Sequence, residues 1–200
     1  MIKRTTDLVL SLLAILILAV PMLIIAVLIR LGSRGPAIFR QRRAGRGGRP
    51  FTMYKFRTMR TGGDPYAPSP HSADDPRLTR LGRFLRQRSL DELPQIFNVL
   101  KGDMSLVGPR PLYERQAGEW DQRQRRRLDV RPGITGYAQV YGRGALTVEE
   151  KLELDAQYVD KQSWWLDCKI LMKTLGIAFS SPGQTYERRY SRAKERETDS

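Results

Sequence analysis

The sequence has too few cysteines and histidines for disulfides or multi-histidine metal sites. Its 200 residues include one cysteine, Cys168, so no disulfide can form within the chain. The single histidine, His71, excludes a metal site built from several histidines. Any metal bound here is therefore expected to be a hard cation, held by carboxylate and phosphate oxygens.

Acidic residues are also scarce. The chain has 35 Lys and Arg residues against 21 Asp and Glu, which gives a formal net charge of +14. Between Arg30 and Arg60 there are ten Arg or Lys residues and no acid. So basic a chain is expected to bind nucleic acid, an anionic membrane surface or phosphorylated small molecules. None of the aromatic-rich patterns that read nucleic-acid bases is present, so we do not expect a nucleic-acid partner.

One long apolar run has no charge at all. Leu8 to Ile29 spans 22 residues without a charged side chain, and as a helix it would be about 33 Å long, enough for a bilayer core of roughly 30 Å. A secretory signal has an apolar region of only about 7–15 residues, and no A-x-A cleavage pattern follows this run. We therefore predict a retained membrane helix. Pro21 lies inside it and predicts a kink.

The charges that flank this run leave its topology open. Lys3 and Arg4 precede it, and Arg30 and Arg34 follow it. Positive flanks prefer the cytoplasm. A helix that spans the membrane must send one basic flank across, whereas a helix that bends at Pro21 and returns keeps both on one side. These residues alone do not choose between the two.

The rest of the chain predicts an α+β fold that is mostly helical. "FTMYKFRTM" (residues 51–59) alternates apolar and polar residues and predicts a strand. Residues 77–90 and 163–179 predict amphipathic helices, which suit a membrane interface, although packing on the domain core explains the same pattern. We divide the chain into a membrane helix, a domain with a small core and a polar C-terminal tail, over residues 1–32, 33–180 and 181–200.

Two adjacent carboxylates, Asp91 and Glu92, stand at the start of a predicted helix in "RSLDELPQIFNVLKGD". Ser89 and Glu92 have capping-box spacing, but Pro94 would then fall at the fifth helical position, where its missing N–H is costly. With Asp91 as the N-cap, Pro94 falls in the first turn, where proline is tolerated, so we predict Asp91 as the cap. The local pattern favours a capping role, but a helix N-terminus also attracts phosphate, so phosphate chemistry stays open as the alternative.

Three arginines stand at turns stiffened or shaped by proline and glycine. They are Arg110 in "GPRP", Arg131 in "RPGITG" and Arg143 in "YGRG". Such turns can fix a guanidinium for bidentate contact with phosphate. Any one of them alone is better explained as a surface arginine at a turn, but three in one short basic domain predict a phosphate pocket.

Long blocks of the sequence resemble the monotopic phosphoglycosyl transferases, the bacterial sugar transferase family, in its small form with a catalytic domain only. The blocks are "FTMYKFRTM", "RSLDELPQIFNVLKGDMSLVGPRP" and "VRPGITGYAQVYGR". The resemblance implies an enzyme that moves a sugar 1-phosphate from a UDP-sugar to polyprenol (undecaprenyl) phosphate and releases UMP. This reaction initiates glycoconjugate assembly at the bacterial inner membrane, with the catalytic domain on the cytoplasmic face. The N-terminal helix would be re-entrant and kinked at Pro21, with Val20 where the family has serine.

The resemblance also implies roles for individual residues. Asp91 would be the nucleophile that carries a covalent phosphosugar in a ping-pong reaction, with Glu92 assisting. Mg²⁺ would be the cofactor, with Asp91 as a ligand. Asp155 and Asp167 match acidic family positions of unassigned role. The arginines that match positively charged family positions, expected to bind substrate phosphates, are Arg57, Arg86, Arg110 and Arg143.

A second hypothesis needs no catalysis. The net charge and the basic helix over residues 77–90 also suit a membrane-surface protein that binds nucleic acid or anionic lipid. The sequence does not identify the sugar, because none of its motifs reads sugar hydroxyls.

Overall fold

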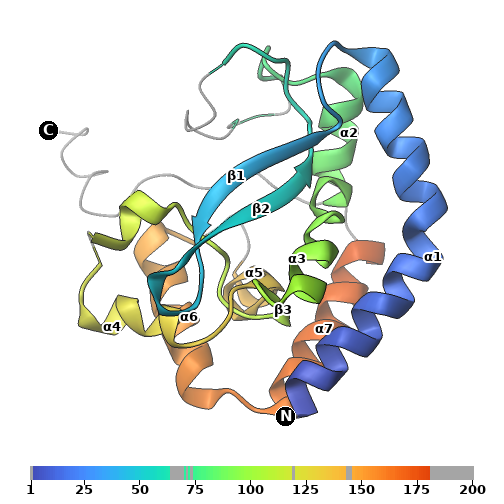
Figure 1. The fold of residues 1–200 in the computed structure, drawn as a ribbon. Coiled ribbons are helices and arrows are strands. Elements are labelled where there is room, and N and C mark those ends of the chain that lie inside the picture. Colours follow the sequence, from blue (N-terminus) through green and yellow to red (C-terminus); the bar gives the residue numbers. More distant parts are fainter. Residues whose placement is uncertain are drawn as a thin grey trace, which may run out of the picture.

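The computed structural model describes residues 2–63, 70, 72, 74–118, 120–142 and 146–180. The fold is α+β and mostly helical, as predicted, with a long apolar helix at the N-terminus and two small sheets. In Figure 1 helix α1 bows along one side of the molecule, and the remaining elements gather on its concave side.

Helix α1 (Ile2–Gly32) is continuous through Pro21, so the predicted kink does not interrupt it. Among the described residues it is the one helix long and apolar enough to cross a membrane. Most of its apolar side chains face outward: Leu16 is 71% exposed and Val20 65%. Such a surface is unsuited to water and fits the predicted membrane helix.

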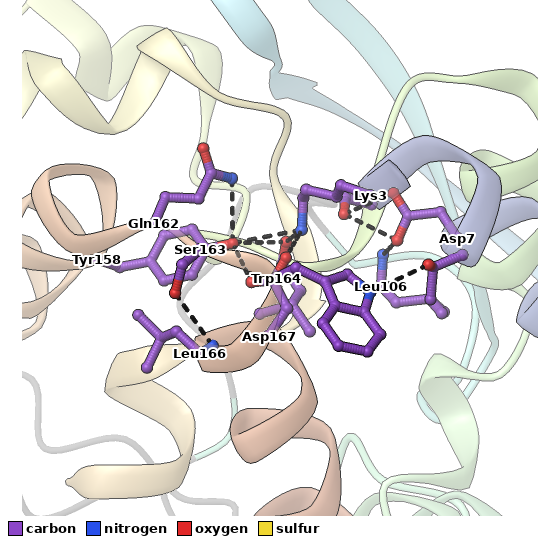
Figure 2. A network of polar contacts seen from close by, with 12 residues as sticks. Lys3, Asp7, Leu106, Tyr158, Gln162, Ser163, Trp164, Leu166 and Asp167 are labelled. Carbon is purple, nitrogen blue, oxygen red and sulfur yellow. Dashed lines mark hydrogen bonds and ion pairs between the residues drawn. The ribbon is translucent and has the colours of Figure 1, made fainter. Parts of the chain in front are cut away.

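The N-terminal end of α1 is tied to the domain by Lys3 (Figure 2). Its Nζ lies 2.6 Å from an oxygen of Asp167 in α7 (Trp164–Ser180) and donates to the carbonyl of Val107 at 2.9 Å. The Tyr158 hydroxyl donates to the other Asp167 oxygen at 2.7 Å. A cation, a buried carboxylate and a buried phenol thus join α1 to α6 (Val148–Lys161) and α7.

Arg4 and Asp7 bind two further segments. The Arg4 guanidinium donates to carbonyls in the last turn of α3 (Gln95–Lys101). The Asp7 carboxylate is 4% exposed and accepts hydrogen bonds from the Ser105 hydroxyl and the Leu106 backbone N–H. The first two turns of α1 therefore contact two neighbouring segments of the chain, the end of α3 and the residues Ser105 and Leu106.

The second half of α1 packs against the same domain. Met22 and Ile29 lie in one apolar core with Phe56 of β2 (Pro50–Phe56) and Leu85 of α2 (Arg80–Gln87). Both ends of α1 are thus bound to one folded unit, and this arrangement bears on its topology.

The two sheets are small and separate. β1 (Ile38–Ala44) pairs antiparallel with β2, which confirms a strand within residues 51–59. β3 (Ser105–Val107) pairs in parallel with β4 (Gly133–Thr135). The remaining elements are the helices α4 (Gln122–Arg125) and α5 (Tyr137–Tyr141) and the 3₁₀ turns η1 (Arg46–Gly48), η2 (Leu90–Glu92), η3 (Glu114–Gly118) and η4 (Arg126–Asp129).

Candidate active site

Asp91 and Glu92 lie in η2, between α2 and α3. Ser89 precedes them in the left-handed conformation, with φ of 55°, and turns the chain out of α2. Pro94 then occupies the N-cap position of α3. The prediction that Asp91 caps α3 is therefore wrong: the two acids form a turn of their own, and the helix starts after the proline that has no N–H to donate.

Glu92 is held by two cations. Its Oε1 accepts hydrogen bonds from Lys55 Nζ at 2.9 Å and from Arg110 Nη2 at 2.8 Å, and its side chain is 15% exposed. Burial alone would raise the pKa of Glu92, but the charges and hydrogen bonds of Arg110 and Lys55 together hold that pKa well below its usual value. Glu92 is therefore a permanently charged and weakly basic carboxylate.

Asp91 has the opposite surroundings. It is 7% exposed, and no donor in the described part of the chain is hydrogen-bonded to its carboxylate. Burial raises the pKa of Asp91; Lys55 opposes this rise, Glu92 adds to it, and Arg86 and Arg110 also oppose it. The fold thus keeps a carboxylate with uncommitted oxygens among three cations, an arrangement typical of a reactive group in a phosphate site.

The loop that carries Arg110 is fixed by close backbone packing. A Cβ placed on Gly133 would lie 2.1 Å from the backbone N of Gly108, so only glycine allows this approach. The Gly133 N–H donates to the Pro109 carbonyl at 2.9 Å. Pro109 and Pro111 stiffen the backbone on both sides of the arginine. "GPRP" and "RPGITG" therefore lie side by side and hold Arg110 toward Glu92.

The other predicted arginines differ in position. Arg86 lies close enough to Asp91 to oppose the rise of its pKa. Arg131 donates from Nε to the Gly102 carbonyl at 2.9 Å, at the far end of α3 from Asp91. Arg143 lies outside the described residues. The structure thus brings Arg86 and Arg110 to the acids and leaves Arg131 at the other end of the helix.

Arg57 binds the C-terminal end of α1. Its guanidinium is buried and donates to the backbone carbonyls of Ile29, Ser33 and Arg34. Ser33 and Arg34 follow the last residue of α1, where the helix itself supplies no further N–H donors, so Arg57 adds donors at this end of the helix. The predicted phosphate contact of Arg57 stays a prediction, and its donors on Nη1 and Nη2 are used here by backbone oxygens.

Sequence reasoning did not single out Lys55. A signal was present in the strand: Phe51, Met53 and Lys55 alternate along β2, and the first two pack in an apolar core with Val99. A lysine that follows core residues on the same face of a strand must find an anionic partner. Here that partner is Glu92.

The two acids differ in whether their oxygens are available to bind Mg²⁺. The described residues contain no group of three or more His, Cys, Asp or Glu side chains placed to bind a metal. Protein-bound Mg²⁺ often takes only one or two carboxylates and completes its shell with substrate phosphates and water. The uncommitted oxygens of Asp91 fit that requirement, whereas Lys55 and Arg110 occupy those of Glu92.

Comparison with known proteins identifies the family. A model of the family described as "Bacterial sugar transferase" matches residues 1–181. The chain belongs to this family. The resemblance inferred from the sequence blocks is thus confirmed, together with the prediction of a sugar transferase enzyme.

Three relatives illustrate what this sugar transferase is similar to. The "Uncharacterized sugar transferase EpsL" of Bacillus subtilis is 45% identical over 91% of this chain and 89% of that protein. The "UDP-glucose:undecaprenyl-phosphate glucose-1-phosphate transferase" of Escherichia coli is 40% identical over 90% of this chain, but over only 40% of its own length. An Aeromonas hydrophila relative, named for N-acetylgalactosamine phosphotransfer to undecaprenyl phosphate, is 43% identical over 87% of this chain and 43% of its own.

Proposed function

We propose that this sugar transferase moves a sugar 1-phosphate from a UDP-sugar to polyprenol (undecaprenyl) phosphate. The observation that carries the proposal is the buried Asp91 carboxylate, which has no hydrogen-bond donor among the described residues and lies beside Lys55, Arg86 and Arg110. The printed names of the relatives support the same donor and acceptor classes. Such a reaction brings two anionic substrates together and needs fixed cations.

The proposed mechanism has two displacements at one phosphorus atom. A carboxylate oxygen of Asp91 attacks the sugar-bearing phosphorus, the bond from phosphorus to the UMP oxygen breaks, and UMP leaves. A phosphate oxygen of the polyprenol phosphate then attacks the same phosphorus, and the bond to Asp91 breaks. The carboxylate is regenerated, and the product is a polyprenyl diphosphate sugar. A carboxylate nucleophile thereby divides one difficult step into two easier ones.

The residues around Asp91 would orient the cations and neutralise the charge of the substrate phosphates. Glu92 is too weak a base to take a proton, so we assign to it the orientation of Lys55 and Arg110. Arg86 and Arg110 would bind the donor phosphates. Asp91 would hold Mg²⁺, which supplies charge neutralisation at the phosphate oxygens when bound.

We propose a re-entrant topology for α1, with both ends on the cytoplasmic face of the bacterial inner membrane. A straight helix of 31 residues would be about 46 Å long and would separate its ends across a bilayer core of roughly 30 Å. Yet Lys3 binds Asp167 and Ile29 packs against Leu85, all within one domain. Contacts at both ends of the helix favour a return over a crossing.

The outer surface suits an anionic membrane. Exposed apolar side chains lie along α1, on α2 at Phe84 and on α7 at Trp165, which is 76% exposed. Tryptophan is favoured at the level of lipid headgroups. Together with the net charge of +14, this surface suggests anionic membrane lipids as a further partner.

The decisive experiment measures UMP. The full chain is incubated in lipid nanodiscs with Mg²⁺, polyprenol phosphate and a panel of UDP-sugars. We expect UMP with at least one donor and none with Asp91→Asn. Absence of UMP with every donor, combined with tight, salt-dependent binding of nucleic acid or anionic vesicles, would favour the non-catalytic alternative instead.

A further inference from the structure

A buried ion pair lies behind the loop of Arg110. Arg127 of η4 and Asp155 of α6 approach to 2.7 Å, and each side chain is 3% exposed. Burial of two charges costs as much as their attraction returns, so such a pair is weak evidence for stability. Asp155 matches an acidic family position whose role the sequence left open.

The pair is poorly arranged for stability. Arg127 Nη1 and Asp155 Oδ1 are buried without a hydrogen-bond partner among the described residues. Each unsatisfied buried polar atom carries a desolvation cost. A purely structural ion pair would be expected to satisfy these atoms. Stability therefore does not explain why the two charges are buried at this place in the fold.

The location is explained by a second hydrogen bond. The same Arg127 Nη2 that contacts Asp155 also donates to the backbone carbonyl of Arg110. The guanidinium carbon of Arg127 lies 4.9 Å from the ring centroid of Trp120, which limits its movement on another side. Asp155 therefore holds Arg127, and Arg127 holds the backbone of Arg110.

The flanking prolines restrict the backbone torsions of Arg110, so a contact that fixes its carbonyl also fixes the direction of its side chain. Pro109 has a restricted φ, and Arg110 precedes Pro111, which confines it to extended conformations. With so few torsions free, a hydrogen bond to the Arg110 carbonyl sets the direction in which its side chain leaves the backbone. That side chain reaches Glu92 with Nη2 at 2.8 Å from Oε1.

We propose that Asp155 and Arg127 are positioning residues, which act through the Arg110 backbone to hold its guanidinium beside Asp91 and Glu92. The proposal rests on the proposed function, because Arg110 is taken to bind the donor phosphates. Electrostatics agree with this arrangement. Burial raises the pKa of Asp155 to about 6, and the charges of Arg127 and Arg110 oppose the rise, so Asp155 lies within electrostatic reach of both arginines.

The test is a double-mutant cycle between Asp155→Asn and Arg110→Met. We expect Asp155→Asn alone to lower kcat/KM for UMP release about 10- to 100-fold, as loss of an outer-shell partner does elsewhere. In the Arg110→Met background it should cause less than about a twofold further loss, since the group it positions is gone. A purely structural role would instead multiply the two losses.

Two further variants separate positioning from folding. Arg127→Met with Asp155→Leu replaces the pair by apolar residues, so it should fold normally yet keep the catalytic loss. Glu153→Gln is the matched control: its acid lies two residues from Asp155 on α6 and pairs with exposed Arg123, so activity should not change.

The outcomes are distinct. Multiplicative losses in the cycle, wild-type kcat/KM in the apolar pair, or failure of both Asp155 variants to fold would each overturn the positioning role. UDP affinity, measured by calorimetry, gives a readout that needs no turnover, and Asp155→Asn should weaken it as Arg110→Met does. A wild-type chain that binds UDP but releases no UMP from any donor would instead refute the proposed function.

Discussion

Asp91 and Glu92 are consecutive carboxylates of one 3₁₀ turn, yet within the described part of the chain Glu92 alone of the two has hydrogen-bonded cations. Lys55 and Arg110 both contact Glu92, while the Asp91 carboxylate has no donor within the described residues. Successive residues of a helical turn point in different directions, so one turn can offer its two acids to different partners. This division favours Asp91 as the reacting group and Glu92 as the residue that orders the cations.

The division predicts different effects of two matched amide substitutions. Asp91→Asn should lower UMP release by at least about 10³-fold without loss of folding, because it removes the nucleophile. Glu92→Gln should lower it about 10- to 100-fold and also lower the thermal midpoint, because Lys55 and Arg110 lose a buried partner. With labelled donor and no acceptor, the wild type should retain label on the protein and Asp91→Asn should not. Label retained by Asp91→Asn would remove Asp91 as the nucleophile.

Two acids of α6 predict opposite effects of pH on stability. Burial raises the pKa of Asp155 to about 6, so its contribution to the free energy of unfolding is largest below about pH 4 and is lost as pH rises to about 6. Hydrogen bonds from Arg123 and Gln157 lower the pKa of Glu153, so its contribution is present above its ordinary pKa and lost as pH falls.

The check is thermal unfolding between pH 3.5 and pH 7 in detergent, with Asp155→Asn and Glu153→Gln alongside the wild type. Relative to the wild type, Asp155→Asn should lose stability toward low pH and Glu153→Gln should gain it. The Glu153 effect should be the smaller and should fade in salt, because that pair is exposed. Equal slopes in all three proteins would contradict both assignments.

The sequence predicted the parts of the site that local patterns encode. Local patterns predicted the apolar helix, a strand within residues 51–59 and the family blocks around Asp91 and Arg110. The N-cap assignment failed because Ser89 adopts a left-handed conformation, which starts a separate turn before Pro94. Capping rules describe one helix at a time and do not foresee a second turn inserted before it.

Long-range partners were beyond a reading of single segments. Lys3 and Asp167 are 164 positions apart, and Arg127 and Asp155 are 28 apart. Neither pair has a spacing that marks it, since both depend on how α1 and α6 pack against the domain. Arg57 is the clearest case: the family resemblance implied a phosphate contact, whereas in the structure its guanidinium donates to carbonyls at the C-terminal end of α1.

Arg57 therefore predicts a stability effect larger than its effect on substrate. Arg57→Met should lower the free energy of unfolding by about 2–3 kcal/mol, because hydrogen bonds from a charged donor to the α1 carbonyls are lost in a buried site. The KM for the UDP-sugar should change less than about twofold, whereas Arg110→Met should raise it. Arg60→Met removes a nearby exposed arginine and serves as the control. A raised KM with unchanged stability would restore Arg57 to the phosphate site.

The membrane topology predicts which engineered cysteines can be labelled from outside the cell. After Cys168→Ser, single cysteines are placed at positions 2 and 34 and treated with a maleimide that does not cross membranes. In the otherwise wild-type chain neither position should be labelled until the cells are permeabilised. Labelling at position 2 alone would establish a span and overturn the re-entrant proposal.

The same labelling assay can test how much the Lys3 contacts contribute to the topology of α1. A crossing helix would leave Asp167 buried without Lys3 and would take Asp7 away from Ser105 and Leu106, at a cost of about 3–5 kcal/mol for a broken buried pair. Lys3→Met combined with Asp167→Asn removes most of that cost and one positive charge from the N-terminal flank. A measurable fraction of molecules should then expose position 2. Lys169→Met removes an exposed charge two residues further along α7 and should leave position 2 protected. If both variants stayed fully protected, the return of α1 would depend on Pro21 and packing rather than on the Lys3 contacts.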